Sequence, residues 1–245
     1  MRRLWQDLAD LVFPADCAGC GEPRAELCGR CRAALDGRRA RRVRPDPAPG
    51  GLPVVHAAAP YQDAVRAVLL AHKERGALGL AAPLGTALAG AAGAAGAARG
   101  GAGGGGGEGG GAPTLLVPLP STPRSTRARG HDPTRRVALA AARVLRGSGV
   151  PARVVPVLRQ RRAVADQSGL NSRQRKANLK GALEVNARAV RLFGPGARVI
   201  IVDDLLTTGS SLAEAARALS ADAGVRRISA AVIAAPAEAF EVNRN

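Results

Sequence analysis

Aromatic side chains are scarce in this 245-residue sequence, which has one Trp, one Tyr and three Phe. The hydrophobic core must therefore consist of Leu, Val, Ile and Ala, with little stacking of rings. Lysine is also scarce, because only three of the 36 basic residues are Lys and the others are Arg. Abundant Arg, Ala and Gly with little Lys is typical of a GC-rich coding bias, so part of the Arg content carries no functional meaning.

Long apolar runs are missing as well. No run of about 18 apolar residues occurs, so we expect no membrane span. Near the N-terminus, Asp7 and Asp10 interrupt the apolar run that a secretory signal needs. We therefore expect a cytoplasmic protein, in which thiols stay reduced.

The positive charge is concentrated in the middle of the chain. Residues 114–191 carry 17 basic and three acidic side chains, a net charge of +14 out of +17 for the whole chain. A polyanionic ligand is expected to bind there. Two interpretations stay open: the arginines neutralise the phosphates of a small ligand, or they form a groove for single-stranded nucleic acid. The second interpretation has little support from aromatic residues, since none lies among the Arg clusters.

Predicted strands and helices alternate along most of the chain. Strands are expected at 54–59, 115–119, 154–158, 198–202 and 227–234, and helices at 61–74, 78–98, 132–146 and 212–223. This alternation predicts an α/β fold with a parallel sheet flanked by helices. Ligands of such folds bind at the carboxyl ends of the strands.

The remaining segments suggest the domain organisation. Residues 1–35 are expected to hold a short amphipathic helix and a cysteine knuckle, residues 36–53 a linker, and residues 54–245 the α/β domain. Residues 100–111 are almost all Gly and predict a disordered loop at 99–112. The later part of helix 78–98 is expected to be weak because Gly recurs in it.

Residues 199–211 carry the most specific motif. Four consecutive β-branched residues at 199–202 predict a central strand buried on both faces. Asp203 and Asp204 follow at its end, where carboxylates can face the hydroxyls of a ligand or a hydrated metal ion. The alternative is a plain strand–turn–helix connection with a solvated acidic pair.

A small, hydroxyl-rich turn comes next. It consists of Thr207, Thr208, Gly209, Ser210 and Ser211. Its backbone N–H groups and the N-terminus of the following helix favour an anion such as a phosphate. Ser211 and Glu214 have the spacing of a capping box. The motif is neither a Walker loop nor a Gly-x-Gly-x-x-Gly fingerprint. Two carboxylates that can bind a diol lie next to a turn that can bind a phosphate, and this combination predicts a ribose phosphate ligand.

All four cysteines lie in one short segment, Cys17-x2-Cys20-x7-Cys28-x2-Cys31. Two such CxxC knuckles can supply four thiolates to a tetrahedral, structural Zn²⁺. A disulfide pair and a degenerate, empty site are the alternatives, and a reducing compartment disfavours the disulfides.

Several of these motifs together resemble the ComF family of type I phosphoribosyltransferase-like proteins, which have an N-terminal zinc knuckle. The matching pieces are the four cysteines, Lys73-Glu-Arg-Gly76, Val117-Pro-Leu-Pro120, Arg127-Ala-Arg129-Gly130, Gln167-Ser-Gly-Leu170, Arg173, Arg175-Lys-Ala-Asn178 and the 199–211 motif. They occur in family order. The sequence departs from the family at His131-Asp132-Pro133, where Phe-Asn-Gln is common.

The resemblance implies a site for 5-phosphoribosyl-1-pyrophosphate (PRPP). Asp203 and Asp204 would bind the ribose diol directly or through Mg²⁺, and the turn at 207–211 would hold the 5′-phosphate. Arg127 and Arg129 would face the pyrophosphate, and Lys73 would also contact the ligand. Catalysis would fall to Asp203, Asp204 and Arg129, with a nucleophile displacing pyrophosphate at ribose C1.

The resemblance also implies an alternative without catalysis. ComF-type proteins are associated with uptake and processing of transforming DNA. On this interpretation the chain is an accessory protein that binds single-stranded DNA or competence-type DNA-processing proteins.

Overall fold

The computed structural model describes residues 16–98, 113–121, 126–127, 130–161, 181–194 and 196–241. Two predicted segments lie outside the described residues: almost all of the N-terminal helix, and the Gly-rich loop.

A six-stranded sheet forms the centre of the molecule, with the strand order β1-β2-β8-β7-β3-β4. The strands are β1 (Arg41–Val43), β2 (Val54–Pro60), β3 (Thr114–Pro118), β4 (Ala152–Val154), β7 (Arg198–Leu205) and β8 (Ile228–Ala235). All neighbours are parallel except β1, which pairs antiparallel with β2 at the edge. The predicted α/β class with a parallel sheet is therefore confirmed.

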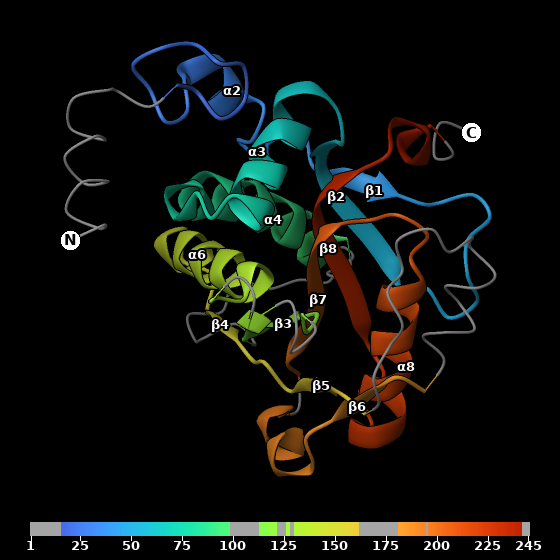
Figure 1. The fold of residues 1–245 in the computed structure, drawn as a ribbon. Coiled ribbons are helices and arrows are strands. Elements are labelled where there is room, and N and C mark those ends of the chain that lie inside the picture. The colour runs from blue at the N-terminus through green and yellow to red at the C-terminus, as the bar shows by residue number, and fades with distance from the viewer. Residues whose placement is uncertain are drawn as a thin grey trace.

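Helices cover both faces of this sheet (Figure 1). Helices α3 (Asp63–Glu74), α4 (Ala81–Ala97) and α6 (Pro133–Gly147) share one apolar cluster with Ile200 and Val202. Helix α8 (Ser210–Ala223) packs on the other face with Val199 and Ile201. Alternate residues of β7 thus enter opposite cores, as the β-branched run predicts.

The shorter elements complete the chain. They are α2 (Gly29–Ala33), the 3-10 helices η1 (Leu78–Leu80), η2 (Ala187–Leu192) and η3 (Ala237–Phe240), and the strands β5 (Leu158–Gln160) and β6 (Leu183–Val185). The last two strands form a separate antiparallel pair. The predicted single strand at 154–158 is wrong, because the chain leaves the main sheet after β4 and joins β6 instead. Pro156 lies at this break and has no N–H for a sheet ladder.

The main sheet begins earlier than residue 54. Strand β1 lies inside the segment predicted as a linker, and its residues 41–43 pair with residues 55–57 of β2. The division of the chain into domains stays a prediction.

Helix α4 is continuous to Ala97, so the expectation of a weak later part is wrong. Two of its glycines are needed for close packing. A Cβ on Gly85 would lie 2.4 Å from the Cβ of Ala140 in α6, and one on Gly90 would lie 2.4 Å from the carbonyl oxygen of Gly37. Tertiary packing therefore outweighs the low intrinsic helix propensity of glycine.

By length and composition alone, Leu78–Ala97 could cross a membrane. However, 61% of its most apolar window is buried inside the protein. Helix α4 packs there against α6, β2 and β8. Burial of this kind is typical of a core helix, and we infer no membrane span from it.

Candidate functional site

The acidic pair lies at the carboxyl end of β7, where Asp203 still pairs in register with Val232 of β8. Because successive side chains of a strand point to opposite faces, the two carboxylates have different surroundings. Asp203 lines a cavity on the side of α8. Asp204 does not line this cavity, and its Oδ2 accepts a hydrogen bond from Lys73 Nζ of α3 at 2.6 Å.

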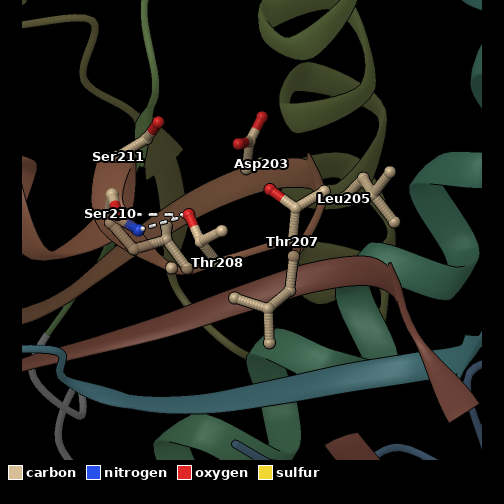
Figure 2. Close-up of a pocket in the computed structure, with 9 residues that line it drawn as sticks. Asp203, Leu205, Thr207, Thr208, Ser210 and Ser211 are labelled. Atoms are coloured by element: carbon tan, nitrogen blue, oxygen red, sulfur yellow. Dashed lines mark hydrogen bonds between the residues drawn. The ribbon is translucent and has the colours of Figure 1, made fainter. Parts of the chain in front are cut away.

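The hydroxyl-rich turn connects β7 to α8 and forms most of the cavity wall. The cavity, with a volume of about 50 Å³, is lined by Asp203, Leu205, Leu206, Thr207, Thr208, Gly209, Ser210, Ser211 and Leu212. Figure 2 shows the Asp203 carboxylate and the hydroxyls of Thr207 and Ser211 pointing to the same side of the turn. The structure thus brings Asp203 together with all five predicted turn residues, and the roles of these residues stay predictions.

Glycine is required at the tip of this turn. Gly209 is the N-cap of α8 and has φ 75° and ψ 0°, a left-handed conformation that L side chains rarely adopt. Thr208 Oγ1 lies 3.1 Å from Ser210 Oγ and accepts a hydrogen bond from the Ser210 N–H at 3.4 Å (Figure 2). The turn therefore presents hydroxyls and backbone N–H groups at the positive end of the α8 dipole, where an anion is favoured.

The predicted capping box at Ser211 and Glu214 is wrong. Helix α8 starts two residues earlier than predicted, after Gly209, and Glu214 faces inward. Its Oε1 accepts a hydrogen bond from the Leu183 N–H of β6 at 3.1 Å, and both of its oxygens bind Arg217 at 2.8 Å. Glu214 therefore joins α8 to β6, and no carboxylate in the described part of the chain caps the anion-favouring end of the helix.

The environment of Asp203 favours its protonated form. Burial raises the pKa of this carboxyl well above its ordinary value, and the neighbouring Asp204 raises the pKa further. The Lys73 ammonium and the Asp204 N–H, which donates to Asp203 Oδ1 at 2.9 Å, act in the opposite direction. Within the pair a proton is therefore favoured on Asp203, while Asp204 faces the Lys73 ammonium.

The predicted basic residues are only partly described. Arg127 is exposed in the segment between β3 and α6, and it does not line the cavity. Arg129 lies outside the described residues. Lys73 pairs with Asp204, and its predicted contact with a ligand stays a prediction.

Two contacts of the site have no signal in the sequence. A Cβ on Gly209 would lie 2.9 Å from Leu52 Cδ1 and 3.5 Å from Pro45 Cγ, so the segment predicted as a linker packs against the turn. His72 of α3 and His131, which precedes α6, also lie edge to face with ring centroids 6.2 Å apart. Both contacts join distant parts of the chain, which no local pattern reveals.

The four cysteines form a compact cluster away from this site. The Sγ atoms of Cys17, Cys20, Cys28 and Cys31 all lie within 4.8 Å of one another. Four thiolates around Zn²⁺ at 2.3 Å would have sulfur–sulfur distances of about 3.8 Å, and the Sγ atoms of Cys20 and Cys28 are 3.6 Å apart. The cluster therefore fits a tetrahedral metal such as zinc, and only Cys20 is exposed.

Comparison with known proteins agrees with this geometry. Residues 140–244 match the family model described as phosphoribosyl transferase domain, which is less than half of the chain. A search of curated proteins gave no match. The C-terminal part of the chain is therefore phosphoribosyl transferase-like, and it contains every residue that lines the cavity.

Proposed function

We propose that the protein binds PRPP or a related ribose phosphate and transfers its phosphoribosyl group to a nucleophile with release of pyrophosphate. The observation that carries this proposal is the single cavity shared by Asp203 and the turn 207–211 at the end of the central strand. The family match over residues 140–244 supports the same chemistry.

Each side of the cavity suits one part of such a ligand. The turn's N–H groups and the hydroxyls of Thr208, Ser210 and Ser211 would hold the 5′-phosphate at the N-terminus of α8. Asp203 would bind the ribose hydroxyls, for which a carboxyl group at hydrogen-bond distance is suited. Asp204, paired with Lys73, would complete the acidic end of β7.

Magnesium fits this acidic end because it prefers oxygen ligands and uses one or two carboxylates together with phosphates. When bound, it would neutralise negative charge on the diphosphate. Asp203 and Asp204 would hold it, and Lys73, which binds Asp204, would help to offset negative charge on the leaving group.

Turnover is tested by pyrophosphate release. The purified chain would be incubated with PRPP, Mg²⁺ and a panel of purine and pyrimidine bases, with Asp203→Asn as the matched control. We expect release with at least one acceptor and at least a hundredfold less (about 2.7 kcal/mol) with the variant. No release above the variant with any acceptor would reject transfer to a base.

A second candidate is binding of single-stranded DNA by a ComF-type accessory protein. The observation that supports DNA binding is the charge of α6, which carries four arginines and no acidic residue. All four are exposed: Arg135, Arg136, Arg143 and Arg146. Binding of single-stranded DNA would weaken steeply with salt, and Arg135→Ala with Arg143→Ala would reduce the salt dependence by about two phosphate contacts. Unchanged binding in this double variant would exclude α6 as the DNA surface.

Two further assignments belong to the same proposal. The cysteine cluster holds structural Zn²⁺, which its four thiolates and buried position support. We also propose a cytoplasmic location, because a reducing compartment keeps such thiols available for the metal.

A further inference from the structure

The β1–β2 loop, residues 44–53, packs directly on the hydroxyl-rich turn (Figure 1). Leu52 and Pro45 come from opposite ends of this loop, and both lie close to the position that a side chain of residue 209 would take. A Cβ on Gly209 would lie 2.9 Å from Leu52 Cδ1, 3.2 Å from Leu52 Cδ2 and 3.5 Å from Pro45 Cγ. Leu52 also packs on the apolar cluster that contains Leu206 and Leu212. The loop therefore forms an apolar wall against Gly209.

The β1–β2 loop is held at both ends. Val43 pairs with Val55, so the two strands close the loop. At its start the Arg44 N–H donates to the carbonyl oxygen of Ala239 at 3.0 Å, and near its end the Leu52 N–H donates to that of Pro49 at 3.3 Å. Four of its ten residues are proline, whose ring fixes φ and leaves the chain few conformations. The loop can therefore act as a stiff support for whatever packs on it.

The turn is a segment that benefits from such a support. Gly209 has no side chain, and glycine loses more conformational entropy on ordering than any other residue. The hydrogen bond from the Ser210 N–H to Thr208 Oγ1 is long at 3.4 Å, so it restrains the turn only weakly. Backbone N–H groups bind an anion best when they already point at it, because ordering them during binding opposes affinity.

We propose that Leu52, supported by Pro45, is a positioning residue that holds Gly209 in its left-handed conformation and thereby fixes the N–H groups of the turn for a phosphate. Leu52 does not line the cavity, so it acts through the turn and not by contact with the ligand. The inference rests on the proposed function and makes the affinity of that site depend on a loop between the first two strands.

The alternative is that Leu52 contributes only to packing. A leucine of that kind would stabilise the whole chain and leave the conformation of the turn unchanged when it is shortened. A positioning residue changes two further quantities, the order of the turn in the free protein and the affinity for the phosphorylated ligand. Both quantities can be measured separately from stability.

The turn can be observed without a ligand. Two of the chain's seven threonines lie in it, so ¹⁵N-threonine labelling reports on it directly. We expect Leu52→Ala to shift or broaden the Thr207 and Thr208 amide signals and to speed their hydrogen exchange, and Thr86 of α4 to stay unchanged. Leu145→Ala is the matched control, because Leu145 is buried in the apolar cluster on the other face of the sheet. It should leave Thr207 and Thr208 unchanged.

Calorimetry measures the consequence for binding. PRPP with Mg²⁺ would be titrated into the same proteins, and Leu52→Ala should bind it about tenfold more weakly, because ordering of the turn then opposes binding. Leu52→Ile keeps a branched aliphatic side chain of the same volume and should bind within about twofold of wild type. Leu145→Ala should also bind as wild type does, although its melting temperature falls.

The outcomes separate this inference from the proposed function. If PRPP binds wild type and Leu52→Ala equally, or the Thr207 and Thr208 signals are the same in both, the inference is wrong and the proposed function stands. Equal weakening by Leu145→Ala would also overturn the inference, because loss of stability would explain both effects. If PRPP does not bind wild type, the proposed function falls and the inference falls with it. Leu52→Val replaces Leu52→Ala, under the same criteria, if the alanine variant does not melt in one transition.

Discussion

At the scale of single residues, Asp203 combines a functional position with a cost in stability. Its carboxyl lies in the cavity wall beside a second acidic residue, and burial holds its pKa well above the ordinary value of 3.8. Between these two pKa values the folded state binds more protons than the unfolded state. The free energy of unfolding therefore falls as the pH rises through that window.

Replacement of Asp203 by Asn should remove this cost. We expect Asp203→Asn to raise the stability at pH 7 by about 1–2 kcal/mol while binding of PRPP is lost, a trade often found at functional sites. Thermal melts from pH 4 to pH 8 would show a flatter pH dependence than wild type. Asp204→Asn is the comparison, because it breaks the pair with Lys73. A lower melting temperature for Asp203→Asn at pH 7 would contradict the account.

Glu214 illustrates the opposite case. Burial raises the pKa of its carboxyl, but the Arg217 guanidinium and the Leu183 N–H outweigh burial and hold the pKa below its ordinary value of 4.5. Its stabilisation is therefore complete above that value and is lost as the pH falls through the lower folded-state pKa.

The variant Glu214→Gln should therefore destabilise the protein by about 1–3 kcal/mol near pH 7. Urea unfolding would measure this difference, which should shrink as the pH falls below about 4.5. Glu238→Gln is the control, because Glu238 is exposed in η3. Equal stability of wild type and Glu214→Gln at pH 7 would show that the contact between α8 and β6 contributes nothing.

At the scale of elements, glycines set the distance between α4 and α6. Gly85→Ala should destabilise the protein by about 1–3 kcal/mol, because the new methyl group would overlap Ala140. Gly93→Ala is the matched control on the same helix. A Cβ there meets nothing within 4 Å, so higher helix propensity should stabilise by up to about 1 kcal/mol. Denaturant midpoints would measure both, and changes of the same sign would reject the packing argument.

Most elements were predictable from the sequence because local chemistry decides them. The β-branched run at 199–202 forms the buried part of β7. Helix α6 lies within one residue of the predicted range 132–146 at each end, with Asp132 as its N-cap and Pro133 in its first turn. The wrong predictions are those that tertiary packing decides. Glu214 binds β6 instead of capping α8, and α4 continues through glycines that its neighbours require.

The same division applies to the candidate site. Asp203 and the turn 207–211 are separated by only three residues, so a local motif in the sequence was enough to predict that they lie together. Both line the same cavity. The contact between Lys73 and Asp204 joins residues 131 positions apart, and only resemblance to a family drew attention to Lys73. The packing of Leu52 on Gly209 was not predictable, because residues 36–53 have the composition of a linker.

At the scale of the whole molecule, the cysteine knuckle and the α/β domain share one core. Cys17, Cys28 and Cys31 belong to the same apolar cluster as α3, α4 and α6. A Cβ on Gly19 would lie 2.7 Å from Cys31 Sγ and 3.2 Å from the Cβ of Ala64 in α3. Gly19 of the knuckle therefore lies between the Cys31 thiol and the first turn of α3.

Metal removal should consequently affect more than the knuckle. We expect chelation of the bound metal, about one zinc per chain, to lower the melting temperature of the entire chain in one transition. Calorimetric melts before and after chelation would measure this, with readdition of zinc as the control. A separate low-temperature transition, with the main transition unchanged, would show that the knuckle folds independently.

The central claim is that Asp203 and the turn 207–211 form a site for a phosphorylated ribose, and titration calorimetry tests it most directly. PRPP with Mg²⁺ would be titrated into the wild-type protein and into Asp203→Asn and Ser210→Ala. The account predicts saturable binding at one site per chain in wild type, lost in Asp203→Asn and weakened about tenfold in Ser210→Ala, roughly 1.4 kcal/mol. Absence of binding in wild type, or equal binding in all three proteins, would contradict it.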